Sequence, residues 1–88
     1  MPIFFIYYNG YVMRLSYLKS KTIINYLDGK NLGNIIDAIL DEKGKIIGLV
    51  IEKKKFLISF FTNKKEMTIK WDQIEKIGED VILVSVAY

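Results

Sequence analysis

A chain of 88 residues is long enough for one small domain and too short for two. It contains no cysteine and no histidine, which excludes disulfides, metal sites built from those residues and catalysis by a histidine base. The net charge of +3 arises from 13 basic and 10 acidic residues that are mostly interspersed, as on an ordinary mixed surface.

Residues 1–12 differ from the rest because they carry no charge, whereas every charged residue lies between positions 14 and 80. This segment is too short to span a bilayer, which takes about 20 apolar residues, and it lacks the basic start of a signal peptide. Its aromatic and β-branched residues favour a strand, and Asn9-Gly10 is typical of a hairpin turn. We expect an extension, either an added strand or a loosely docked arm, before a domain at residues 13–88. Alternatively, translation starts at Met13 and the extension is an artefact of gene calling.

From Met13 to residue 40 the sequence predicts short strands. Ser16 is a weak candidate cap for one helical turn, and Asp28-Gly29 predicts a turn in which the glycine takes a positive φ. A strand follows over residues 32–40, and Gly33 near its start indicates a bulge or a close approach of another backbone. Within that strand we expect Asp37 to face solvent or to make a turn contact rather than to act in catalysis. The apolar residues that alternate roughly with polar ones before this strand are Leu15, Leu18, Ile23, Ile24, Tyr26 and Leu27.

The clearest local signal is the run Asp41-Glu42-Lys43-Gly44 between two β-rich segments. Asp at the first position and Gly at the fourth are typical of a type I turn followed by a left-handed glycine, so a hairpin is expected. Its second arm, residues 45–52, is strongly β-branched.

The last third of the chain predicts a strand, a short turn and a closing strand. Met67, Ile69 and Trp71 alternate and should share one face. Asp72 is a plausible helix cap, with Glu75 three residues later completing a capping box. Residues 78–80 form a corner, and residues 81–86 form an apolar strand. The whole pattern favours an all-β fold, a small partly open barrel of five to six strands in meander order with one short helical turn.

Several of these segments, in this order and spacing, resemble the PRC-barrel domain family. The resemblance covers about residues 13–84 and is strongest to the short single-domain members of spore-forming Firmicutes, which are named as sporulation proteins. Residues 1–12 are extra to the family pattern, and lysines of the 53–65 segment stand where the family usually has an arginine- and glycine-rich stretch. The matching segments are residues 13–21, Asp28-Gly29, Leu32-Gly33, Asp37, residues 41–46 and residues 71–84.

The resemblance implies a small β-barrel that acts as a docking module, as in a photosynthetic reaction-centre subunit and a ribosome-maturation factor. It supplies no catalytic motif to carry over, and docking by this chain is therefore an analogy. We accordingly expect no enzymatic activity, no catalytic residues, no cofactor and no metal site.

The segment between residues 53 and 65 is the candidate binding site because lysines flank aromatic residues there. Such a segment could hold a protein partner, phosphates and stacked bases of a nucleic acid, or an anionic membrane surface. It could also be an ordinary hairpin whose apolar residues fill the barrel while the lysines protect its edge. Phe60 and Phe61 are adjacent, so in a strand they point to opposite faces and cannot both enter one core. The candidate residues are Lys53, Lys54, Lys55, Phe56, Phe60, Phe61, Lys64 and Lys65.

These observations favour a non-catalytic, sporulation-associated docking module. The hydrophobic content of 51% is slightly high for a domain, which suggests that part of the surface is covered by a partner, most economically by a second copy in a homodimer. The lack of cysteine fits a reducing compartment, so we expect a cytoplasmic protein. The alternative is a small nucleic-acid-binding barrel that uses the basic and aromatic 53–65 segment.

Overall fold

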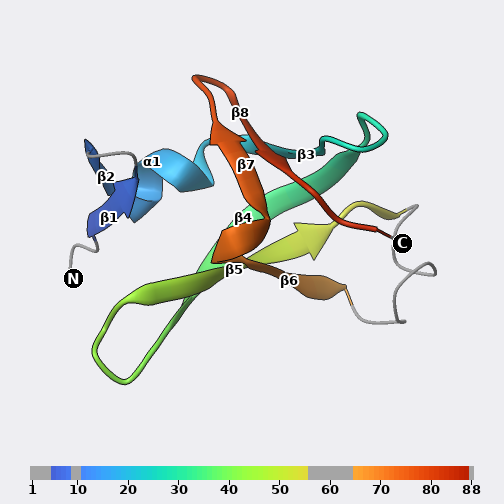
Figure 1. Cartoon of the computed structure of the whole chain (residues 1–88). Coiled ribbons are helices and arrows are strands. Elements are labelled where there is room, and N and C mark those ends of the chain that lie inside the picture. The colour runs from blue at the N-terminus through green and yellow to red at the C-terminus, as the bar shows by residue number, and fades with distance from the viewer. Residues whose placement is uncertain (1–4, 9–10, 56–64, 88) are drawn as a thin grey trace.

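The computed structural model describes residues 5–8, 11–55 and 65–87, which form mainly short strands (Figure 1). The order of the strands and helices along the chain is β1 (Phe5–Tyr8), β2 (Tyr11–Arg14), α1 (Leu15–Lys19), β3 (Thr22–Asn25), β4 (Asn31–Leu40), β5 (Ile46–Lys53), β6 (Glu66–Lys70), η2 (Trp71–Gln73), β7 (Ile74–Ile77) and β8 (Val81–Val84).

Six of the strands form one sheet in the order β6-β5-β4-β3-β8-β7. Strands β3 to β6 follow one another as an antiparallel meander, and the antiparallel β7–β8 pair returns to the other side of β3, where β8 runs parallel to it. The edge strands β6 and β7 are joined by the three-residue turn η2, so the sheet must curl to bring its two edges near each other. The expected all-β class, a small partly open barrel, is confirmed.

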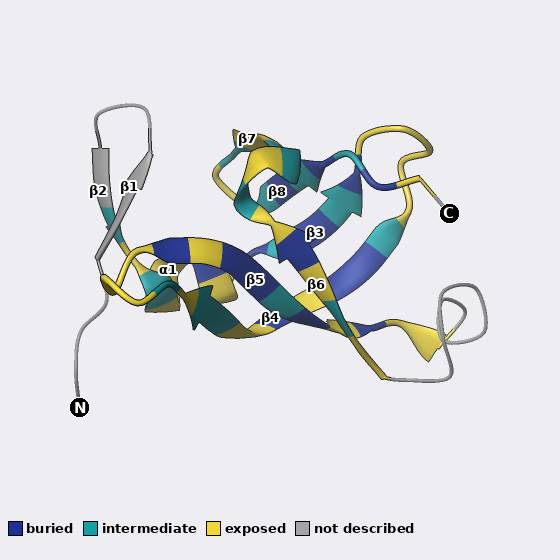
Figure 2. Cartoon of the chain, turned by 60° about the horizontal axis from the view of Figure 1, so that its bottom comes forward, coloured by how far each residue is buried: buried dark blue, intermediate teal, exposed yellow. Residues whose placement is uncertain are grey.

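The core lies inside the curled sheet, and its apolar side chains follow the alternation that a strand imposes. Along β6, Ile69 is buried and Met67 is half-buried, whereas the alternate residues Glu66, Thr68 and Lys70 are exposed. Trp71 and Ile74 pack against this core from its rim. Figure 2 shows buried and exposed positions alternating along β5. The buried hydrophobic residues are Leu18, Ile23, Leu32, Ile35, Ile46, Leu49, Ile51, Ile69, Ile82, Val84 and Val86.

The hairpin predicted at residues 41–44 joins β4 to β5. The carboxylate Oδ1 of Asp41 accepts hydrogen bonds from the backbone N–H groups of Lys43 and Lys45, each at 2.9 Å. The N–H of Gly44 donates to the carbonyl of Asp41 at 3.0 Å, and Gly44 has a φ of 84°. The turn therefore has the aspartate and the left-handed glycine that the sequence predicts.

Strands β4 and β5 contain irregularities that each leave one extra residue outside the ladder. Opposite β3, the extra residue of β4 is Leu32, next to Gly33, where a bulge or close approach was expected. Between β4 and β5 the extra residues are Ile36 on β4 and Ile47 on β5. Their side chains are exposed, at 38% for Ile36 and 47% for Ile47. The bulges thus carry two isoleucines to the surface of the barrel.

Two buried polar side chains connect distant parts of the chain. The ammonium of Lys21 donates to the carbonyl of Gly78 at 2.6 Å and to the carbonyl of Glu79, in the corner between β7 and β8. It also lies 3.9 Å from the centre of the Tyr17 ring. The side chain of Asn25 donates to the carbonyl of Val86 at 2.8 Å and accepts from the Val86 N–H at 3.2 Å. Both residues thereby fix the C-terminal hairpin to the β3 region.

The predicted caps are wrong. Asp72 is exposed inside η2, and Glu75 lies in β7, where its carboxylate accepts from the hydroxyl of Ser85 at 2.7 Å. The side chain of Gln73 accepts from the N–H of Lys70 at 2.8 Å instead, because the cap of the turn is Lys70, two positions before the expected Asp72. Helix α1 likewise begins at Leu15 after Arg14, so Ser16 lies inside it and caps nothing.

The N-terminal residues form a small sheet of their own. Strands β1 and β2 pair antiparallel, with Tyr8 opposite Tyr11, and lie beside α1 at one end of the molecule (Figures 1 and 2). The pairing expected on either side of Asn9-Gly10 is present, while these two turn residues lie outside the described residues.

Candidate docking surface

The two ends of the lysine segment lie side by side in the structure. The backbone N–H of Lys53 donates to the carbonyl of Lys65 at 2.7 Å, which continues the β5–β6 pairing by one step. The side chain of Lys53 is buried, whereas Lys54, Lys55 and Lys65 are exposed. Three of the five lysines in the segment are therefore shown on the surface. The remaining candidate residues lie outside the described part of the chain, namely Phe56, Phe60, Phe61 and Lys64.

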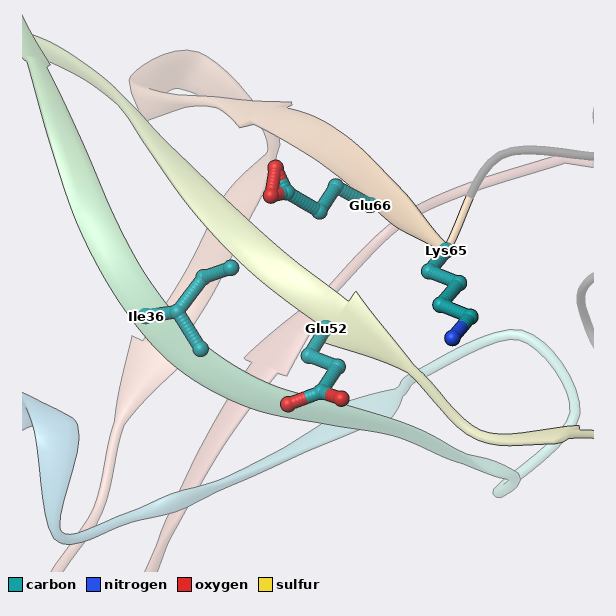
Figure 3. A pocket seen from close by; sticks show the side chains of 4 residues that line it. All are labelled: Ile36, Glu52, Lys65 and Glu66. Carbon is teal, nitrogen blue, oxygen red and sulfur yellow. The ribbon is translucent and has the colours of Figure 1, made fainter.

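Lys65 also lines an open hollow of about 510 Å³ together with Ile36, Glu52 and Glu66 (Figure 3). Glu52 reaches from β5 toward β4, and Glu66 reaches from β6 toward β5, on the same side of the sheet as Ile36. Strands β4, β5 and β6, together with Lys65 just before β6, thus supply one apolar and three charged side chains to the same site. The candidate segment ends at this hollow.

The electrostatics of the hollow are mixed. Glu52 and Glu66 stand directly opposite each other in the β5–β6 ladder, an arrangement of like charges that destabilises a sheet in the absence of a nearby cation. Lys65 supplies one positive charge beside them. An exposed apolar side chain beside charges of both signs is a combination found in protein interfaces, where apolar contacts are bordered by polar groups.

Sequence reasoning missed the exposed isoleucines, although a signal for them was present. Ile35-Ile36 and Ile46-Ile47 are adjacent apolar pairs in strands, and adjacent residues point to opposite faces. The first member of each pair is buried and the second is exposed. The same reasoning was applied to Phe60-Phe61 and could have been applied to these pairs.

A second exposed apolar site, also missed, lies in the turn between β3 and β4. Tyr26 is 65% exposed and Leu27 is 62% exposed. Asn25 stabilises this turn through two hydrogen bonds. Its side chain accepts from the Leu27 N–H at 3.3 Å, and its backbone carbonyl accepts from the Gly29 N–H at 2.7 Å. The sequence contained a signal for this exposure, because Tyr26 and Leu27 directly precede the predicted Asp28-Gly29 turn and turn residues usually lie on the surface.

The acidic side chains do not gather into a recognisable metal site. In residues 5–8, 11–55 and 65–87 no group of three or more acidic residues is placed to hold a metal ion. Asp37 is exposed, and its carboxylate accepts from the Ala38 N–H at 2.8 Å, in agreement with a solvent-facing role. None of the described helices is long and apolar enough to cross a membrane.

Comparisons with known proteins agree with this fold. The family model described as "PRC-barrel domain" matches residues 12–87. The chain is also similar to a protein of Bacillus subtilis (strain 168) named "Probable sporulation protein YlmC". The two sequences are 36% identical over 74 residues, which cover 83% of this chain and 91% of the relative.

Proposed function

The chain belongs to the PRC-barrel domain family, and on that premise we propose that it is a non-catalytic docking module that binds another protein in sporulation. The observation that carries this proposal is the hollow formed by Ile36, Glu52, Lys65 and Glu66. Its exposed isoleucine and mixed charges suit a protein surface, and it lies at the ends of the lysine segment. The sporulation context is supported by the relative whose name refers to that process.

Dimerisation and location in the cytoplasm are further parts of the proposal. A homodimer is supported by the high apolar content of the sequence, and a cytoplasmic location by the absence of cysteine. Light scattering tests the first, because a strict monomer at high protein concentration contradicts it. Cell fractionation tests the second.

The docking proposal is tested by capture experiments with the immobilised full chain. Extracts of growing and of sporulating Bacillus subtilis are passed over the wild type and over Ile36→Asp, Lys65→Glu and Thr68→Asp variants. Thr68 is exposed on β6 but does not line the hollow, so its variant is the matched control. Loss of a central interface contact costs about 2 kcal/mol or more, so we expect capture to fall more than tenfold for the two hollow variants.

The results separate the parts of this proposal. A protein captured only from sporulating cells, retained by the control variant and lost from the hollow variants, supports both the surface and the process. Equal capture by all four forms contradicts a docking role for the hollow. Equal capture from growing and sporulating cells contradicts the sporulation context.

Nucleic-acid binding is the second candidate, because Lys54, Lys55 and Lys65 are exposed at the two ends of the segment. The carboxylates of Glu52 and Glu66 beside Lys65 repel phosphates, which makes this role the weaker one. A salt titration of binding to RNA and single-stranded DNA decides the question. Neutralising several phosphates gives a steep fall of affinity with salt, and no binding at low salt rules this function out.

A further inference from the structure

The edges of the two sheets differ in how they are protected against pairing with another chain. Strand β6, one edge of the main sheet, exposes Glu66 and Lys70, and strand β7, the other edge, exposes Glu75 and Lys76. Charged residues on an edge strand are a common means of preventing association with other strands. The main sheet is therefore protected at both edges.

The N-terminal hairpin differs, because its strand β1 carries no charged residue. Strand β1 has the sequence Phe-Ile-Tyr-Tyr and pairs, within the described residues, only with β2. Strand β2 carries Arg14 and continues directly into α1, whereas β1 contains no charged residue. An isolated two-stranded sheet is marginally stable in water, and three or more strands are usually needed. Among the described residues, β1 therefore has an uncharged edge with no neighbouring strand, which favours a further strand.

We propose that this further strand is β1 of a second copy, so that two hairpins form a four-stranded antiparallel sheet in the order β2-β1-β1-β2. A two-fold axis pairs the same residues from both copies and closes the contact without a second surface. Charge supports a second copy as the occupant. Each copy has a net charge of +3, but residues 1–12 contain none of its charged residues, so the strands meet without opposing like charges. This inference rests on the homodimer proposed above and assigns its contact to the hairpin, apart from the docking hollow.

The register of the hairpin shows which backbone groups would form the new pairing. Tyr8 and Tyr11 are partners in the ladder and are separated in the sequence by two residues. They therefore form the hydrogen-bonded pair that closes a β-turn. Hydrogen-bonded and open pairs alternate in an antiparallel ladder. The backbone groups of Tyr7 therefore point away from β2, to the free edge. A Tyr7→Pro variant removes an outward N–H without removing a bond between β1 and β2.

The test compares the mass of the full chain in solution for the wild type and for Tyr7→Pro, Tyr7→Lys and Thr68→Lys. We expect the wild type and the Thr68→Lys control, which changes the protected edge β6, to be dimers. Both Tyr7 variants should be monomers with the circular dichroism spectrum of the folded barrel. Because the chain lacks cysteine, single cysteines give a second measurement that does not disrupt the pairing.

In that measurement Phe5→Cys, Ile6→Cys and Tyr7→Cys are oxidised separately, with Asp72→Cys on η2 as control. When the two-fold axis passes beside residue 5, 6 or 7, that residue lies opposite the same residue of the second copy. Two cysteines at that position are then close enough to form a disulfide. We expect an interchain disulfide for one of the three and none for the control. A dimer that survives the Tyr7 variants and forms no disulfide at the hairpin overturns this inference while leaving the proposed homodimer intact. A monomeric wild type overturns both, and the capture experiment still tests docking.

Discussion

At the scale of single residues, Gly33 is the position where a side chain is least tolerable. Its φ of 140° lies in the region that side chains rarely adopt, and a Cβ there would collide with the backbone carbonyl of Glu52. Glu52 belongs to β5, the neighbouring strand, so Gly33 allows β4 and β5 to approach closely next to the bulge that β4 forms opposite β3. The sequence marks this glycine because a lone glycine inside a strand is typical of a bulge or of a close backbone contact.

Replacing Gly33 by alanine should therefore lower the free energy of unfolding by about 3 kcal/mol or more, from backbone strain and the collision together. Gly29→Ala is the matched control, since Gly29 also has a positive φ, of 74°, but open space around its Cβ position. Its cost should be about 1 kcal/mol, from strain alone. Urea denaturation measures both values, and equal losses would show that the close approach to Glu52 does not matter.

At the scale of elements, the C-terminal β7–β8 pair is held by side chains that the sequence does not mark as special. Lys21 is almost fully buried, and its ammonium reaches the corner between β7 and β8. Its hydrogen-bond partner Gly78 is 57 residues away in the sequence. A lysine between a serine and a threonine would ordinarily be assigned to the surface. Its role depends on the parallel pairing of β3 with β8, and this long-range contact is not visible in local sequence patterns.

The Lys21→Met variant tests this connection. Methionine preserves much of the apolar stem but leaves the carbonyls of Gly78 and Glu79 without their donor, so stability should fall by about 2 to 3 kcal/mol. Tyr17→Leu removes only the ring beside the ammonium and should cost less than about 1 kcal/mol. Thermal and urea unfolding measure both variants. A loss for Lys21→Met no larger than for Tyr17→Leu would contradict the role assigned to the two carbonyl contacts.

The same elements show what the sequence could and could not predict. The Asp41–Gly44 hairpin and the Met67–Trp71 face were found because they depend on turn chemistry and on period-two alternation, both of which are local. The caps at Asp72 and Ser16 failed because a two-residue shift of a short turn changes which side chain reaches the free N–H. The hollow was missed because it combines Ile36 from a bulge with residues of two other strands.

At the scale of the whole molecule, the sheet is an open barrel whose two edges are joined by η2 but do not pair with each other. Within residues 5–8, 11–55 and 65–87, strands β5, β4, β3 and β8 have a neighbour on both sides, whereas β6 and β7 have one. The backbone of an edge strand is opened by smaller fluctuations than the backbone of an interior strand.

Amide hydrogen exchange should reveal this difference. We expect the hydrogen-bonded amides of β6 and β7 to exchange at least about tenfold faster than those of β4 and β5, which corresponds to about 1.4 kcal/mol in opening free energy. Measurement residue by residue with NMR compares the strands within one sample, so each strand serves as a control for the others. Uniform protection over all six strands would indicate that the edges pair in solution and that the barrel is closed.

The parallel contact between residues 22–25 and 81–84 also has a consequence for biosynthesis. As the chain leaves the ribosome, β3 can pair with β4 soon after both have emerged, but its second neighbour, β8, is made only after β4 to β7. The apolar side of β3 stays incompletely covered until then, and contacts between such distant residues form slowly. The nascent meander is thus a species that chaperones could recognise, and release of β8 from the ribosome is the step that completes the domain.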